Sequence, residues 1–88
     1  MVKNRRSEIE IIKDILDLSK NGSKKTSILY KGNLSFYQLQ EYLPYLIEKD
    51  VLEEKYHRDN GRSYKFYKTT TKGLSLLEQA KKTLSYLK

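Results

Sequence analysis

The chain of 88 residues contains no cysteine and no tryptophan, and it has one histidine, one proline and four glycines. Without cysteine it can form neither a disulfide nor a thiolate metal site, and it has no thiol nucleophile. It also lacks an apolar run long enough to cross a bilayer and the pattern of a secretory signal peptide. These absences predict one small cytoplasmic domain without a membrane partner, stabilised by apolar burial or by association of subunits.

Side chains that could support catalysis or bind a metal are equally scarce. His57 has no second ligand or nucleophile at a useful spacing, and the acids mostly lie on predicted helix faces or beside lysines rather than as a pair. We therefore expect no enzymatic activity, no metal, no cofactor and no small-molecule substrate.

Positive charge is in excess and is unevenly distributed. Eighteen Lys and Arg residues against eleven Asp and Glu residues give a formal net charge of +7. Segments 20–31 and 55–72 together contain most of the basic side chains and a single acid, whereas segment 32–54 is acidic. Charge that serves only solubility tends to scatter, while charge that binds a polyanion tends to cluster. The distribution favours a nucleic acid as partner and a nucleoid-associated location.

The N-terminal third is patterned for two helices. Ser7 and Glu10 form a capping box at the start of an apolar pattern with helical spacing, and Asn21-Gly22 supplies a left-handed stop. Ser23 or Thr26 can cap a short second helix that ends at residues 32–33.

A third helix follows after a tight turn. Ser35 and Gln38 form a second capping box, and the leucines Leu39, Leu43 and Leu46 give the helix a buried stripe. Pro44 in the interior removes one backbone hydrogen bond, at a cost of roughly 3 kcal/mol unless the helix bends. Because the apolar stripe continues in phase past the proline, we predict one bent helix rather than two.

Residues 51–57 and 63–69 are rich in β-prone side chains, and Asn60-Gly61 between them is typical of a type I′ hairpin. Thr70 can then cap a final helix that runs almost to the C-terminus. The order of elements predicts a mainly α fold with a small β-hairpin: a winged helix-turn-helix plus a C-terminal helix. We expect one domain, with residues 1–70 as the core with its β-wing and residues 71–88 as a C-terminal dimerisation helix.

Four segments carry a resemblance to a known family: Ile9-Glu10-Ile11-Ile12-x-x-Ile15-Leu16, Lys25-Thr26-x-Ile28-x-Tyr30-Lys31-x-Asn33-Leu34-Ser35, Tyr42-Leu43-x-x-Leu46 with Val51-Leu52-Glu53, and Tyr67-x-x-Thr70-x-Lys72-Gly73. In these the chain resembles the small archaeal winged-helix proteins, described as chromatin-associated or regulatory, that dimerise through a C-terminal helix. Two positions depart from the pattern: Asp50 stands where glycine is usual, and Pro44 interrupts the third helix. The abundance of Lys, Ile, Leu and Tyr also suits a thermophilic source.

In a winged helix, the third helix presents its first turns to the major groove. The candidate DNA-binding side chains there are Ser35, Tyr37, Gln38, Gln40 and Glu41. Gln can pair with adenine, and a Glu carboxylate can accept a hydrogen bond from cytosine N4. The alternatives are an ordinary solvated face, or Gln38 engaged only with Ser35.

Phosphate contacts are expected from the second helix and from the hairpin. The candidates on or beside the second helix are Lys24, Lys25, Thr26 and Lys31, and those on the wing are Arg58, Arg62 and Lys65. Alternatively, the hydroxyls only cap helices and the wing cations protect an exposed hairpin from edge pairing.

The final helix is apolar over more of its circumference than packing on one small domain requires. Its candidate dimerisation residues are Leu74, Leu77, Ala80, Leu84 and Leu87. The alternative is that this face simply covers the first helix. Among the tyrosines, we expect Tyr30, Tyr42 and Tyr67 in the core, and Tyr37, Tyr45, Tyr56 and Tyr64 at the surface.

Together these features predict a double-stranded DNA-binding protein, acting as a homodimeric transcriptional regulator with the third helix in the major groove and the basic wing on the flanking backbone. Two alternatives stay open: a non-specific chromatin or DNA-coating protein, and a winged-helix module that binds another protein.

Overall fold

Two of the helices begin where the sequence provides a capping box. In the computed structural model, which describes residues 7–87, α1 (Glu8–Leu18) starts after Ser7 and α3 (Phe36–Glu48) starts after Ser35. Each serine hydroxyl accepts a hydrogen bond from the backbone N–H three residues on, and the Glu10 or Gln38 side chain accepts one from the serine N–H. Both predicted capping boxes are therefore confirmed.

The short helix α2 (Lys25–Lys31) begins without a side-chain cap. Its N-cap residue is Lys24, so the prediction that Ser23 or Thr26 caps it was wrong. The Ser23 hydroxyl instead donates to the carbonyl oxygen of Leu18 at 2.6 Å, and its backbone forms an isolated antiparallel bridge with Tyr67. Ser23 does not cap α2 because its hydroxyl is bonded to Leu18 and its backbone is paired with Tyr67 of the hairpin.

Helix α1 ends earlier than the sequence predicted. Its C-cap residue is Ser19, whose N–H donates to the carbonyl of Ile15 at 3.1 Å. Gly22 turns the chain with a φ of +94°, and a Cβ at this position would lie 3.2 Å from the ring of Phe66. Asn21-Gly22 therefore shapes the connection to α2 rather than the helix end.

Helix α3 is continuous across Pro44, so the proline does not divide it. The predicted stripe of Leu39, Leu43 and Leu46 is buried. Pro44 itself is exposed, and the absence of its N–H therefore affects the solvent side of the helix.

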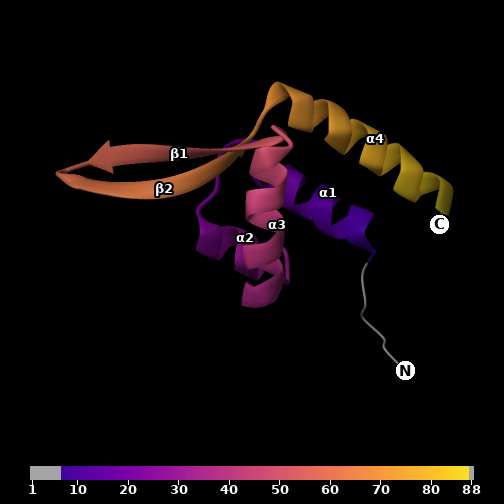
Figure 1. Cartoon of the computed structure of the whole chain (residues 1–88), viewed down its shortest axis with the longest axis horizontal. Helices are drawn as coiled ribbons and strands as arrows, with labels where there is room; N and C mark the ends of the chain where they lie inside the picture. Colours follow the sequence, from indigo (N-terminus) through magenta and orange to yellow (C-terminus); the bar gives the residue numbers. More distant parts are fainter. Residues whose placement is uncertain (1–6, 88) are drawn as a thin grey trace.

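The hairpin is longer than the sequence predicted. Strands β1 (Leu52–Asp59) and β2 (Arg62–Thr69) pair antiparallel from Leu52↔Thr69 to Asp59↔Arg62. Asn60 and Gly61 have φ values of 52° and 77°, as both central residues of a type I′ turn require. All residues from 53 to 65 are exposed, and the distal hairpin extends away from the helices, at the left of Figure 1. It gives the molecule its long, flat shape, with extents of 47, 30 and 19 Å.

One apolar core lies between the helices and the base of the hairpin. Buried side chains come from every element: Ile11, Ile15, Leu16, Ile28, Leu34, Leu39, Leu43, Leu46, Val51, Leu52, Tyr67, Leu77 and Ala80. Buried Thr69 fastens β2 to α1, because its Oγ1 donates to the Leu16 carbonyl at 2.6 Å and its N–H donates to the Ser19 carbonyl at 2.9 Å.

Helix α4 (Thr71–Leu87) follows the hairpin and runs beside α1 (Figure 1). Thr70 caps it as predicted, since its Oγ1 accepts a hydrogen bond from the Gly73 N–H at 2.9 Å. The same hydroxyl donates to the Asp50 carbonyl at 2.7 Å. Asp50 has a φ of +63°, which explains why glycine is usual at this position of the family pattern.

Residues 1–6 and 88, which the predicted domain bounds include, lie outside the described residues. Across residues 7–87, the structure contains no helix with both the length and the apolar character needed to span a bilayer.

Candidate nucleic-acid interface

The two faces of the hairpin meet different elements. Successive side chains of a strand point to opposite faces, so the pair Glu54↔Tyr67 lies on one face and the pair His57↔Tyr64 on the other. Glu54 and Tyr67 border a groove shared with α3, whereas His57 and Tyr64 border a hollow shared with α2. We call these the front groove and the rear hollow.

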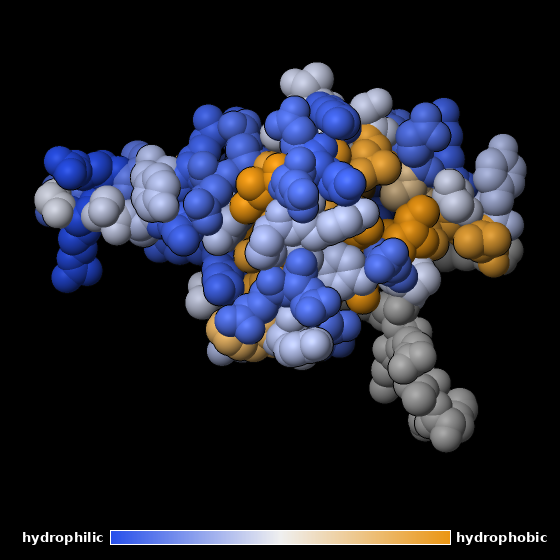
Figure 2. Space-filling model, viewed as in Figure 1, coloured by the Kyte–Doolittle hydropathy of each residue, from blue (hydrophilic) through white to orange (hydrophobic). Residues whose placement is uncertain are grey.

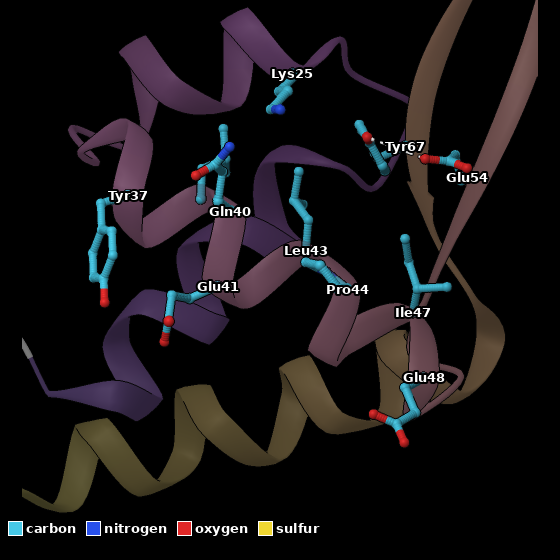
Figure 3. Close-up of a pocket in the computed structure, with 11 residues that line it drawn as sticks. Lys25, Tyr37, Gln40, Glu41, Leu43, Pro44, Ile47, Glu48, Glu54 and Tyr67 are labelled. Atoms are coloured by element: carbon cyan, nitrogen blue, oxygen red, sulfur yellow. Dashed lines mark hydrogen bonds between the residues drawn. The ribbon is translucent and has the colours of Figure 1, made fainter.

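The front groove has a volume of about 790 Å³ and lies between α3 and the hairpin (Figure 3). It is lined by Lys25, Tyr37, Leu39, Gln40, Glu41, Leu43, Pro44, Ile47, Glu48, Glu54 and Tyr67. Leu39 and Leu43 are buried and form its floor, while Tyr37, Gln40 and Glu41 are exposed at its border. Three predicted recognition residues therefore share one accessible surface.

The other two predicted recognition residues form the capping box of α3. Gln38 is half-buried and accepts the hydrogen bond of the Ser35 N–H through its side-chain oxygen at 2.9 Å. The Ser35 hydroxyl accepts from the Gln38 N–H at 3.0 Å. Both side chains are engaged in starting α3, and neither lines the front groove.

The predicted phosphate-binding residues do not form one cluster. Lys25 lines the front groove, with its Nζ 5.0 Å from the ring centroid of Phe36. Lys24 and Lys31 line the rear hollow instead, and the Lys24 Nζ lies 4.4 Å from the ring centroid of Tyr64. Thr26 is exposed in the first turn of α2. The two adjacent lysines Lys24 and Lys25 therefore line hollows that border opposite faces of the hairpin.

The rear hollow, of about 560 Å³, has no acidic side chain among its lining residues. A row of rings crosses it, with centroids 5.2 Å apart for His57 and Tyr64 and 6.4 Å apart for Tyr64 and Phe66. Phe66 packs on Gly22 and Tyr64 carries the Lys24 ammonium. This row braces the hairpin against the turn before α2.

A polar cluster braces the opposite face of the hairpin. The Tyr67 hydroxyl donates to Oε2 of Glu54 at 3.3 Å, and the Lys65 Nζ lies 3.3 Å from the same oxygen. Burial, with the nearby Glu54 carboxylate, raises the pKa of Tyr67, and the hydrogen bond to Glu54 raises the pKa of Lys65. Lys65, predicted as a phosphate ligand, is therefore engaged within the wing, while Arg58 and Arg62 are exposed beside the tip.

The tyrosines divide almost as predicted. Tyr67 is buried and Tyr42 is half-buried, with its pKa raised by burial and by Glu8. The prediction that Tyr30 lies in the core is wrong, because its side chain is 80% exposed. The four tyrosines predicted at the surface, Tyr37, Tyr45, Tyr56 and Tyr64, are all exposed.

On α4, the predicted dimerisation residues differ in how deeply they are buried. Leu77 and Ala80 are buried within the chain's own core and are not available to a partner in this structure. Leu84 is half-buried, and Leu74 and Leu87 are exposed. Only the last three remain accessible to a second molecule.

Sequence reasoning missed an apolar hollow of about 290 Å³ where α1, α3 and α4 meet. Its lining includes Ile9, Ile12, Tyr45 and Leu76, and apolar surface is visible between the centre and the right-hand end of Figure 2, where α1 and α4 lie. Leu76 stands one turn before Ala80, so the helical period could have placed it on the same flank. The hollow itself could not be predicted, because the tertiary fold determines which other helices border that flank.

Within residues 7–87, no three side chains of His, Cys, Asp or Glu gather in a way that could hold a metal ion. Comparison with curated protein sequences finds no significant match.

Solved structures are similar over most of the chain. Sso10a-2, a DNA-binding protein from Sulfolobus solfataricus, is 27% identical with a TM-score of 0.80, over 92% of this chain and 81% of that one. A PadR family transcriptional regulator from Eggerthella lenta is 16% identical with a TM-score of 0.72, over 88% of this chain and 73% of that one. ZitR from Lactococcus lactis, solved in complex with DNA, is 17% identical with a TM-score of 0.65, over 97% of this chain and 60% of that one.

The last two similarities concern the fold alone. The arrangement of three helices, a two-stranded hairpin and a closing helix agrees with the family model that matches residues 5–88. The chain belongs to the winged helix-turn-helix family.

Proposed function

We propose that the protein binds double-stranded DNA as a transcriptional regulator, with α3 in the major groove and the hairpin along the flanking backbone. The observation that carries this proposal is the front groove, where the exposed side of α3 and the base of the hairpin share one surface. An α-helix fits the width of the major groove. The similarity to Sso10a-2, a DNA-binding protein, supports the same conclusion.

Cations at two positions support this function. Lys25 lies at the α2 side of the front groove, and Arg58 and Arg62 are exposed at the far end of the hairpin. Phosphates at two places along the DNA backbone could be reached from these two positions while α3 contacts the bases. No step of this function requires catalysis.

Salt dependence tests the proposal directly. We expect the logarithm of the affinity for duplex DNA, measured by fluorescence anisotropy, to fall linearly with the logarithm of the salt concentration, by about 0.9 for each phosphate neutralised. Lys25→Ala, Arg58→Ala and Arg62→Ala should each weaken binding and lower that slope by about one. Lys82→Ala, an exposed lysine on α4, is the matched control and should change neither. An affinity that stays flat as salt rises contradicts the proposal.

We further propose that the protein acts as a twofold dimer on two half-sites, spaced by about one helical turn of DNA, ~34 Å, or a multiple of it. The accessible leucines Leu74, Leu84 and Leu87 and the apolar hollow around Leu76 are the surfaces available for it. Leu76→Lys and Leu87→Lys should shift the mass measured by sedimentation from dimer to monomer. A monomeric wild-type protein at micromolar concentration contradicts this part alone.

A second candidate function is non-specific coating of DNA. The rear hollow favours it, because Lys24 and Lys31 extend the basic surface beyond the face that a single docked helix would use. Competition between a selected duplex and random duplex separates the candidates: a specific regulator should prefer its site by about a thousandfold or more, and a coating protein by far less.

A further inference from the structure

The helix proposed to enter the major groove carries no positive charge. Among residues 36–48 there is no lysine or arginine, and there are two glutamates, Glu41 and Glu48. Both are exposed residues of the front-groove lining, and in Figure 3 their side chains project away from Lys25 and Gln40. In a protein with a net charge of +7, the surface that would approach the bases is therefore acidic.

Glu41 is the carboxylate whose charge is left uncompensated near the start of the helix. Glu54, across the groove, is bonded to Lys65 and to the Tyr67 hydroxyl. No cation of residues 7–87 forms an ion pair with Glu41, and its side chain is exposed. Unlike the Glu54 carboxylate, this one is free to accept hydrogen bonds from a ligand.

Position within α3 distinguishes Glu41 from Glu48. Glu41 lies one turn after Tyr37, in the half of the helix that a helix-turn-helix protein presents to base edges. Glu48 is the last residue of the helix. Lys25, which could hold a phosphate, lies beside Phe36 at the N-terminal end of α3.

A carboxylate between two rows of phosphates is repelled unless a donor compensates it. In the major groove cytosine offers the N4 amino group, adenine offers an amino group beside the N7 acceptor, and guanine offers only acceptors. A carboxylate therefore suits cytosine best and guanine worst. Its repulsion of the wrong bases contributes to selectivity in addition to its attraction to the right one.

We propose that Glu41 is a specificity-determining residue that accepts a hydrogen bond from cytosine N4 and excludes guanine at one position of each half-site. This inference rests on the proposed binding of duplex DNA. In this proposal, affinity and sequence specificity depend on different residues. The cations of α2 and the wing bind the DNA backbone, and the acidic side of α3 weakens binding to wrong sequences.

The test is selection of bound duplexes from a random pool at moderate salt, with wild type, Glu41→Gln, Glu41→Ala and the control Glu78→Gln. Glu78 is an exposed carboxylate on α4, away from the front groove. For wild type and Glu78→Gln we expect cytosine at one position per half-site, preferred over guanine by about tenfold or more. Glu41→Gln should shift that position toward adenine, because a glutamine amide pairs with adenine N6 and N7.

Glu41→Ala should flatten the preference at that position, leave the others unchanged and increase the affinity for random duplex. Circular dichroism checks that each variant is folded. If wild type binds duplex but Glu41→Ala and Glu41→Gln recover the same sequences as wild type, the role of Glu41 is refuted while the proposed function stands. If wild type binds no duplex even at low salt, both proposals fail.

Discussion

Gly73 is the position where the addition of one methyl group should be most damaging. A Cβ at Gly73 would overlap the carbonyl oxygen of Val51 and would lie 2.6 Å from Cγ2 of Thr69. The backbone of Val51 cannot move aside easily, because its carbonyl accepts a hydrogen bond from the Thr70 N–H at 3.1 Å. Helix α4 would have to shift away from the base of the hairpin.

Two opposing effects set the magnitude for Gly73→Ala. Overpacking of a buried site costs about 1–3 kcal/mol, and a clash with backbone belongs at the upper end of that range. In a helix interior, alanine is more favourable than glycine by about 1 kcal/mol of folding free energy. The net loss is about 2 kcal/mol, which for a domain of this size lowers Tm by roughly 10 °C.

Thermal unfolding followed by circular dichroism measures this change. Ser75→Ala, an exposed position in the same helix, is the control and should change the free energy of unfolding by no more than about 0.5 kcal/mol. If Gly73→Ala melts at or above the temperature of wild type, helix propensity has outweighed the close approach, and the reasoning is refuted.

Three further predictions concern stability. Asp50→Gly should raise the free energy of unfolding by about 0.5–1 kcal/mol in urea titrations, because glycine adopts the observed φ of +63° without strain; an unchanged midpoint contradicts this. Ser19→Ala should be neutral or stabilising by up to about 1 kcal/mol in the same assay, since the buried Ser19 hydroxyl has no hydrogen-bond partner within residues 7–87; a clear loss would reveal a missing partner. The pKa values of Tyr67 and Lys65 are raised in the folded state, so their contribution to stability is complete below about pH 10 and is lost as pH rises further. In melts from pH 8 to 11, Tyr67→Phe should lose less stability than wild type, and equal losses would count against the Glu54 cluster.

The elements that sequence predicts well are those whose cause is local. A capping box requires only Ser7 and Glu10, or Ser35 and Gln38, and an Asn-Gly turn requires only its own two residues. These features appear in the structure because no distant residue competes for their hydrogen bonds. The start of α2 differs, since the bridge between Ser23 and Tyr67 depends on a strand more than forty residues away.

The prediction for Tyr30 failed because the buried side of a short helix is hard to identify from its sequence. Ile28 is buried, and a residue two positions later points to roughly the opposite side of a helix, since each residue advances by about 100°. A helix of seven residues offers too few apolar positions to settle this from the sequence. The sequence also could not predict that Lys24 and Lys25 line different hollows. Strand alternation defines the two faces of the hairpin, but it does not show which element covers each face.

The bracing of the hairpin determines which molecule would bend in the proposed complex. The hairpin is held on one face by the ring row on Gly22 and Lys24, and at its base by Thr69 bonded to α1. With the angle between wing and α3 set in this way, a straight duplex that does not meet both at once would have to curve toward the wing. The energy of that curvature depends on base-pair steps that the protein never touches, so flexible flanking DNA would be bound in preference to stiff DNA carrying the same contacted bases.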